Sequence, residues 1–296
     1  MAALPNGIDI CYETFGDSDD PALLLIMGLG GPMTWWNVEL CSRLADRGFH
    51  VIRYDNRDVG RSSRITPLRR ASRSSAVTTW LGMRRHAEYA LSDLADDAFG
   101  LLDHLGAERA DVFGVSMGGM IAQTMAITHP ERVRSLVSMM STTGRRSVGW
   151  QHPRLFPMLL AATPRTLEEY VERTYRVAAM IGSPGYPFDP VETRARAEET
   201  WERGYHPAGV LRQMLAVITQ PDRTPALRRL ETPTCVLHGL ADRMVHCSGG
   251  RATAAAVRGA ELILIPRMGH DLPAPLYGTF VDAVGRTAAR DRRIAA

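Results

Sequence analysis

Long apolar runs are absent from this chain of 296 residues. A membrane-spanning helix needs about 18 consecutive apolar residues, and no such stretch occurs. Cysteine is also scarce: the four cysteines form no C-x-x-C pair and no metal-ligand spacing, so we expect neither a disulfide scaffold nor a bound metal. Residues 1–10 lack the basic and apolar segments of a secretory signal. We therefore expect a cytoplasmic protein without a membrane span.

Lysine is missing altogether, and all 35 basic residues are arginine, which indicates the codon usage of a GC-rich genome rather than a function. The net charge is only +3, and the arginines are spread along the chain. We therefore expect no nucleic-acid partner. Hydrophobic residues make up 45% of the chain and charged residues 23%, a composition that excludes wholesale disorder.

Short apolar runs bounded by turn residues predict strands that are buried on both faces of a parallel sheet. These runs follow a weakly alternating edge strand at 8–15 and lie at 22–27, 50–54, 111–115, 133–140, 234–238 and 261–265. Amphipathic segments that predict helices separate them, at 35–47, 89–105, 117–129, 248–257 and 277–289. The alternation predicts an α/β fold with a doubly wound, mostly parallel sheet.

Two stretches interrupt this alternation. Residues 64–86 are rich in arginine and serine and predict a long excursion after the strand at 50–54. Residues 144–230 contain helical patterns at 166–179 and 191–203, many prolines and no convincing strand. We therefore expect a helical cap at 144–230, inserted into a core domain that residues 1–143 and 231–296 form.

The clearest chemical motif is Gly114-Val115-Ser116-Met117-Gly118, which fits the Gly-x-Ser-x-Gly pattern of a nucleophile elbow. An apolar run precedes it and a helical segment follows it, so the chain must turn at once from strand to helix. The glycines leave room for this close approach. Ser116 is therefore the candidate nucleophile, at the carboxyl edge of the sheet.

A nucleophilic serine needs a histidine base, and in this architecture the chain order is serine, acid, histidine. His270 follows the last predicted strand and reaches the same edge of the sheet as Ser116. His129 lies at the far end of the helix after Ser116, and His238 precedes the expected place of the acid. His270 is therefore the predicted base.

The acid is expected after the strand at 234–238, where Asp242 lies 28 residues before His270. Asp271 is the local alternative, but a direct neighbour of the base usually points elsewhere. Asp222 comes too early, within the helical insertion. We therefore predict Asp242 as the acid, and a turn aspartate is the structural alternative.

An oxyanion hole needs two N–H donors. Met117 supplies the first, at the start of a helix, and the loop after the strand at 22–27 supplies the second, from Leu29 or, as the alternative, from Gly30. We expect substrate contacts in this region from three residues, Gly28, Trp35 and Trp36. For the two tryptophans, simple packing on the sheet is an equal alternative.

Five segments carry a resemblance to a known family: ALLLIMGLGGPMTWW, HVIRYDNRDVGRSS, GVSMGGMIAQ, HGLADRMV and IPRMGHDLP. Over nearly its full length the chain resembles the α/β-hydrolase superfamily, and more narrowly aclacinomycin methylesterase and related actinobacterial esterases and lipases. The superfamily usually has His-Gly before the oxyanion loop, whereas this chain has Met27-Gly28, as in the methylesterase subgroup. In the second segment we expect Asp55 and Arg57 to be scaffold residues.

The resemblance implies a catalytic triad of Ser116, Asp242 and His270, with oxyanion donors at Leu29 and Met117. It implies a serine esterase or lactonase that acts on an apolar small-molecule ester or lactone, such as a methyl ester of a bulky natural product. Such an enzyme needs no cofactor and no metal. The same triad would also serve a cofactor-free haloperoxidase, a perhydrolase or a carbon–carbon bond hydrolase. A non-catalytic ligand receptor is a further alternative, against which the intact triad argues.

Overall fold

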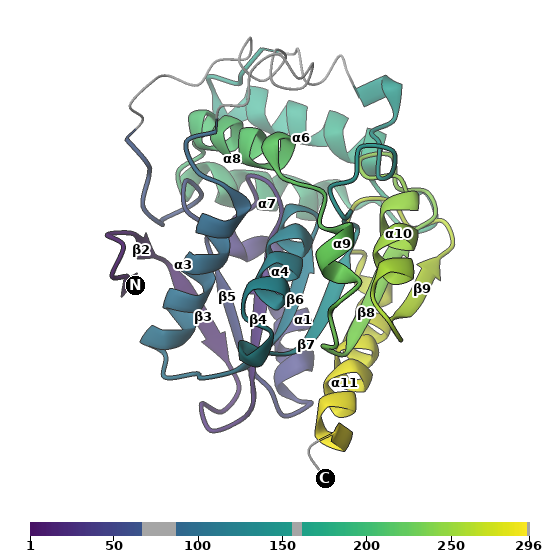
Figure 1. Ribbon diagram of the computed structural model, residues 1–296. Coiled ribbons are helices and arrows are strands. Elements are labelled where there is room, and N and C mark those ends of the chain that lie inside the picture. The colour runs from purple at the N-terminus through teal and green to yellow at the C-terminus, as the bar shows by residue number, and fades with distance from the viewer. Residues whose placement is uncertain (67–86, 156–161, 295–296) are drawn as a thin grey trace.

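The computed structural model describes residues 1–66, 87–155 and 162–294. Its centre is a seven-stranded sheet in the order β3-β5-β4-β6-β7-β8-β9 (Figure 1). Only β3 runs antiparallel, against β5, and the other pairs are parallel. The strands are β3 (Tyr12–Phe15), β4 (Ala22–Ile26), β5 (His50–Tyr54), β6 (Ala110–Val115), β7 (Val133–Met139), β8 (Thr234–Gly239) and β9 (Glu261–Ile265); β1 (Ala2–Ala3) and β2 (Asp9–Ile10) form a separate pair. The predicted doubly wound, mostly parallel sheet is confirmed.

Helices cover both faces of this sheet and its carboxyl edge (Figure 1). One face packs against α3 (Leu91–His104), α4 (Met117–Thr128), α9 (Thr224–Leu227) and α10 (Ser248–Ala256), and the other packs against α1 (Val38–Ala45) and α11 (Tyr277–Ile294). Short 3-10 helices lie at Met33–Trp35, Pro130–Arg132, Pro153–Leu155 and Ala274–Leu276. The helix predicted at 35–47 begins only at Val38, because the side chain of Asn37 caps its first turn.

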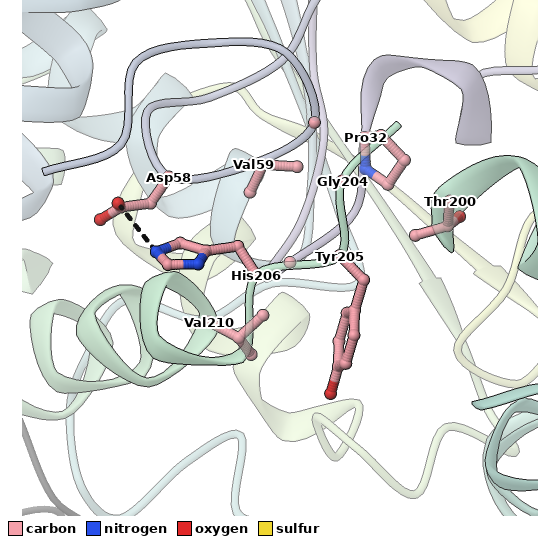
Figure 2. Close-up of a pocket in the computed structure, with 10 residues that line it drawn as sticks. Pro32, Asp58, Val59, Thr200, Gly204, Tyr205, His206 and Val210 are labelled. Atoms are coloured by element: carbon pink, nitrogen blue, oxygen red, sulfur yellow. Dashed lines mark ion pairs between the residues drawn. The ribbon is translucent and has the colours of Figure 1, made fainter. Parts of the chain in front are cut away.

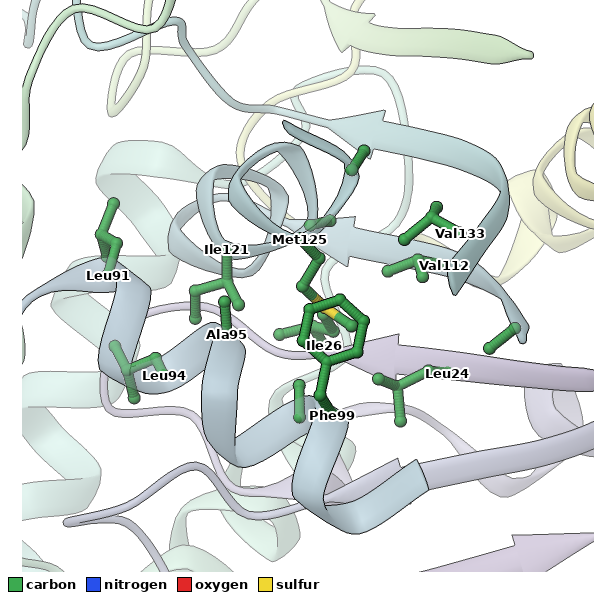
Figure 3. Close-up of a cluster of buried hydrophobic side chains, with 14 of the residues drawn as sticks. Leu24, Ile26, Leu91, Leu94, Ala95, Phe99, Val112, Ile121, Met125 and Val133 are labelled. Carbon is green, nitrogen blue, oxygen red and sulfur yellow. The ribbon is translucent and has the colours of Figure 1, made fainter. Parts of the chain in front are cut away.

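The two-residue repeat of the strands divides the apolar core into two layers. On β4, Leu24 and Ile26 join the cluster under α3 and α4, where Phe99 also lies (Figure 3). Leu23 and Leu25 point to the opposite face and join the cluster under α1 and α11. Both faces of the strand are therefore buried, which explains why its sequence is continuously apolar.

Three helices lie over the carboxyl edge of the sheet, at the top of Figure 1: α6 (Leu167–Ile181), α7 (Pro190–Glu202) and α8 (Pro207–Thr219). We call them the upper helices; they are part of the segment between β7 and β8. Two buried ion pairs fix them to the loop after β5: Arg203 lies 2.7 Å from Asp55, and Arg212 binds Asp58 through hydrogen bonds of 2.6 and 2.8 Å. The placement of the upper helices is therefore determined by charged contacts as well as by packing.

The loop after β5 also stabilises the core directly. Asp55 accepts hydrogen bonds from the backbone N–H groups of Met33 and Arg61, and Arg57 forms two hydrogen bonds of 2.5 and 2.6 Å with the buried Asp97. These contacts agree with the scaffold role expected for Asp55 and Arg57.

Most of the excursion expected at 64–86 lies outside the described residues. No helix among the described residues is long and apolar enough to cross a membrane.

Candidate active site

Ser116 stands at a sharp turn between β6 and α4. Its backbone has φ 57° and ψ −118°, a conformation that L residues rarely adopt, and α4 begins at the next residue, Met117. The N–H of Ser116 donates a hydrogen bond of 2.9 Å to the carbonyl of Met139 on β7. The strand–turn–helix that the Gly-x-Ser-x-Gly motif predicts is therefore present, and neighbouring strands hold it.

The two glycines of the motif are required for close backbone contacts. A Cβ on Gly114 would overlap the carbonyl oxygen of Gly118 in the first turn of α4, and a Cβ on Gly118 would overlap the carbonyl oxygen of Ile26 at the end of β4. Both clashes involve main-chain atoms, which cannot rotate away as a side chain would. Any larger residue at either position would therefore force the main chain of the elbow to shift.

Replacing Gly118 with alanine is expected to destabilise the protein by about 2 kcal/mol or more, because the overlap with Ile26 forces α4 away from β4. Gly285→Ala is the matched control, since Gly285 lies inside α11 with open space around it. The control is expected to stabilise the protein by about 0.5–1 kcal/mol through its helix propensity. Urea unfolding of both variants measures the difference, and equal stabilities would contradict this account.

A chain of hydrogen bonds joins Ser116 to two further side chains. The Nε2 atom of His270 lies 3.0 Å from the Oγ atom of Ser116, and the Nδ1 atom lies 2.7 Å from the Oδ2 atom of Asp242. These side chains come from the segments that follow β6, β8 and β9, so the parallel sheet brings their carboxyl ends to one edge. Asp242 is fully buried, whereas 11% of the His270 side chain is exposed.

Asp242 is held as a carboxylate by its surroundings. Burial would raise its pKa, but the adjacent His270 and His238 offset this effect and hold the pKa well below its ordinary value of 3.8. The Oδ1 atom accepts hydrogen bonds from the N–H groups of Met244 at 2.8 Å and Val245 at 2.9 Å. The two backbone N–H groups thereby fix the Oδ1 atom, and the Oδ2 atom faces His270.

The depressed pKa of Asp242 predicts a pH dependence of stability. A carboxyl whose pKa is lower in the folded state stabilises the fold in full above its unfolded pKa, near 3.8, and this contribution disappears as the pH falls further. The difference in unfolding free energy between the wild type and Asp242→Asn is therefore expected to shrink between pH 6 and pH 3. Urea unfolding at these pH values tests the sign, and a difference that grows as the pH falls would contradict it.

The sequence argues against His238 as the base, and the structure places its side chain against Asp242. Its Nε2 atom lies 2.8 Å from the carbonyl oxygen of Val245 and 3.4 Å from Asp242, and its side chain is fully buried. The sequence contains a signal for this contact, because His238 is the next-to-last residue of β8 and lies only four residues before Asp242.

The alternative acid, Asp271, has different partners. Its carboxylate accepts hydrogen bonds from the N–H and the hydroxyl of Ser183, which follows α6, and no hydrogen bond joins it to His270 within the described part of the chain. The N–H of His270 donates to the carbonyl of Ile181 at 2.7 Å. The loop that carries His270 is therefore fixed to the end of an upper helix.

The loop after β4 lies against Ser116. A Cβ on Gly28 would stand 3.1 Å from the Cβ of Ser116, so Gly28 touches the turn that carries the serine. The N–H of Gly31 donates to the carbonyl of Gly28, and that of Gly30 donates to the side chain of Gln213. Leu29 is 37% exposed, and its N–H has no partner among residues 1–66, 87–155 and 162–294.

The two candidate tryptophans have different surroundings. Trp35 is half-buried, and its indole N–H donates a 3.0 Å hydrogen bond to Thr200 on α7, so it lies between the loop after β4 and an upper helix. Trp36 is fully buried in the core, with its ring 4.9 Å from that of Phe113. This position does not support the expected substrate contact of Trp36, because the ring packs on the sheet.

A small cavity of about 10 Å³ separates the loop after β4 from the upper helices (Figure 2). Gly30 and Pro32 line it on the loop side, and Tyr205 and Val210 line it on the side of α8. Its volume is close to that of one water molecule, and Ser116 is not part of its wall. The cavity is therefore a packing gap beside the loop rather than a substrate site.

In the described part of the chain, no three His, Cys, Asp or Glu residues gather as a metal site would require.

Comparisons with known proteins agree with this architecture. The family described as alpha/beta hydrolase fold matches residues 21–273. The chain is 32% identical to rhodomycin D methylesterase DauP of Streptomyces sp. strain C5, over 94% of each protein, and 27% identical to 3-oxoadipate enol-lactonase 2 of Acinetobacter baylyi, over 81% of this chain and 78% of that protein. The crystal structure of the enol-lactonase from Burkholderia xenovorans LB400 matches 97% of this chain and 99% of that one, with a TM-score of 0.76 and 21% identity. The chain therefore belongs to the α/β-hydrolase fold family.

Proposed function

We propose that this enzyme cleaves a carboxylic ester through an acyl-enzyme formed on Ser116. The observation that carries the proposal is the hydrogen-bonded chain from Ser116 through His270 to Asp242. The loop after β4 touches Ser116 at Gly28, and the N–H of Leu29 in this loop has no partner within the described residues. A serine, a histidine and a buried carboxylate in this order are the parts of a nucleophilic triad.

Each group has a defined part in the proposed reaction. The Ser116 Oγ atom attacks the ester carbonyl carbon while its proton passes to the Nε2 atom of His270. The carbonyl oxygen becomes an oxyanion that accepts hydrogen bonds from the N–H groups of Leu29 and Met117. The alcohol leaves with the proton from His270. Water then attacks the acyl group and gives a proton to His270. As the bond between the acyl carbon and the Oγ atom breaks, His270 passes this proton to Oγ, so the carboxylic acid and free Ser116 are formed. Asp242 orients His270 throughout.

We infer that the substrate is a largely apolar small-molecule ester, such as a methyl ester or a lactone of a bulky natural product. The methylesterase and the enol-lactonase among the relatives support this class. The upper helices would serve as a cap over the site. They contribute a cluster of aromatic rings. The ring centre of Tyr170 lies 4.5 Å from that of Tyr205 and 5.8 Å from that of Trp201. Such a cluster suits a flat, apolar molecule. Neither a cofactor nor a metal takes part.

A panel of aromatic methyl esters, lactones and p-nitrophenyl esters tests this function, with mass spectrometry of the intact protein at short reaction times. We expect turnover of at least one class and an added acyl mass that maps to Ser116. Ser116→Ala is the control and should show neither. If no ester reacts, and peroxide-dependent halogenation or cleavage of a carbon–carbon bond is observed instead, the proposal of ester hydrolysis is wrong.

A further inference from the structure

Gln213 is a buried polar residue of α8, next to the buried Arg212, and the proposed ester hydrolysis does not use it. Its side chain is fully buried, and both ends of the amide are bonded to backbone. The Oε1 atom accepts a 2.8 Å hydrogen bond from the N–H of Gly30, and the Nε2 atom donates a 2.9 Å hydrogen bond to the carbonyl of Arg57. One side chain thus joins the loop after β4 to the loop after β5.

This contact determines which N–H groups of the oxyanion loop remain available. Gly30 donates to Gln213, and Gly31 donates to the carbonyl of Gly28, so neither N–H can turn to a substrate without breaking a bond. Leu29 lies between Gly28 and Gly30, which these two hydrogen bonds hold, and its own N–H is unpaired within the described residues. Of the two donors that the sequence left open, Leu29 and Gly30, the hydrogen bond of Gln213 favours Leu29.

Two neighbouring residues of α8, Val210 and Arg212, fix the position of this helix over the loop after β4. Val210 packs against Gly30 so closely that a Cβ on Gly30 would stand 2.9 Å from the Cγ2 atom of Val210. Arg212 binds the carboxylate of Asp58 through two hydrogen bonds, with both side chains buried. Gly30 has φ 67°, a conformation that glycine adopts easily and from which it can also depart easily. The loop therefore depends on contacts from α8 to keep one conformation.

We propose that Gln213 is a positioning residue of the oxyanion hole, which aims the N–H of Leu29 at the developing oxyanion by holding Gly30 from the upper helices. This inference rests on the proposed ester hydrolysis and identifies the element that completes its site. Glutamine suits the task because it offers an acceptor to Gly30 and a donor to Arg57 at the same time. The upper helices would then be part of the catalytic geometry as well as a cover over the substrate.

Gln213→Met tests the inference, because methionine has a similar length and shape but forms neither hydrogen bond. We expect kcat to fall about 10- to 100-fold while KM changes less than about threefold, since a displaced donor weakens the transition state more than the bound ester. The rate at which a fluorophosphonate modifies Ser116 should fall in parallel, because its phosphoryl oxygen uses the same donors.

Gln123→Met is the matched control. Gln123 is also fully buried, and its amide bonds Ser138 and Arg223, away from the oxyanion loop. We expect a lower melting temperature for this variant but an unchanged kcat. Val210→Ala is a milder second variant that loosens the contact with Gly30 and should lower kcat about threefold to tenfold even if Gln213→Met does not fold.

The outcomes separate the two proposals. If Gln213→Met folds and keeps the kcat of the wild type, or if Gln213→Met is unfolded and Val210→Ala keeps the kcat of the wild type, the proposed positioning of the oxyanion hole by Gln213 is wrong. If the wild type hydrolyses no ester, the proposed function fails. The fluorophosphonate rates of the same variants then still report whether Gln213 positions the donors beside Ser116.

Discussion

Ser116→Ala is expected to lower kcat for the best ester by about 10⁵-fold while the protein stays folded. The Oγ atom of Ser116 is the group that His270 contacts at 3.0 Å, and alanine removes the atom that would carry the acyl group. The N–H groups of the loop after β4 remain in place, so weak residual catalysis by water is the most that we expect to survive. Product formation measured by chromatography, together with circular dichroism, checks the expectation.

The backbone of Ser116 provides a second test at the same position. Its φ of 57° is strained for alanine and serine but natural for glycine. Ser116→Gly should therefore be inactive like Ser116→Ala but about 1 kcal/mol more stable than that variant, because strain relief exceeds the added chain entropy. Activity within tenfold of the wild type in either variant would contradict the role of Ser116 as the nucleophile. A less stable glycine variant would contradict the strain.

The sequence predicts most of this fold because its signals are local. Each apolar run became a strand, since a strand between two helical layers must be apolar on both faces, as Leu24 and Leu25 show. The Gly-x-Ser-x-Gly turn is likewise local, because its glycines are required by atoms within a few residues or on the next strand. The chain order of strands then placed Asp242 and His270 at the edge where Ser116 lies.

The remaining features depend on contacts between distant segments. The bond from Gln213 to Gly30 joins residues 183 positions apart, and no local pattern around either residue specifies it. A buried Arg212-Gln213 pair in an apolar helix indicates only that polar partners exist, without naming them. The two adjacent tryptophans cannot be told apart from the sequence, because Trp35 and Trp36 are the same residue type. Only the three-dimensional packing shows that Trp36 faces the core.

Asp242→Asn is expected to lower kcat about 10⁴-fold with little change in shape. The backbone N–H groups of Met244 and Val245 both donate to the Oδ1 atom, so the amide oxygen of asparagine must occupy that position. Its NH₂ group then replaces the Oδ2 atom, 2.7 Å from the Nδ1 atom of His270. An NH₂ group donates, which forces Nδ1 to accept and moves the ring proton to Nε2.

The displaced proton explains why such a small substitution has such a large effect. With a proton on Nε2, His270 donates to Ser116 and can no longer remove its proton, so the nucleophile loses its base. Asp271→Asn is the matched control, because Asp271 bonds Ser183 and has no hydrogen bond to His270 within the described residues; we expect it to lower kcat less than tenfold. Steady-state kinetics of the two variants at the same pH compare the two carboxylates directly. If Asp271→Asn lost more activity than Asp242→Asn, the acid would have been assigned to the wrong residue, since only the partner of Nδ1 controls the proton on Nε2.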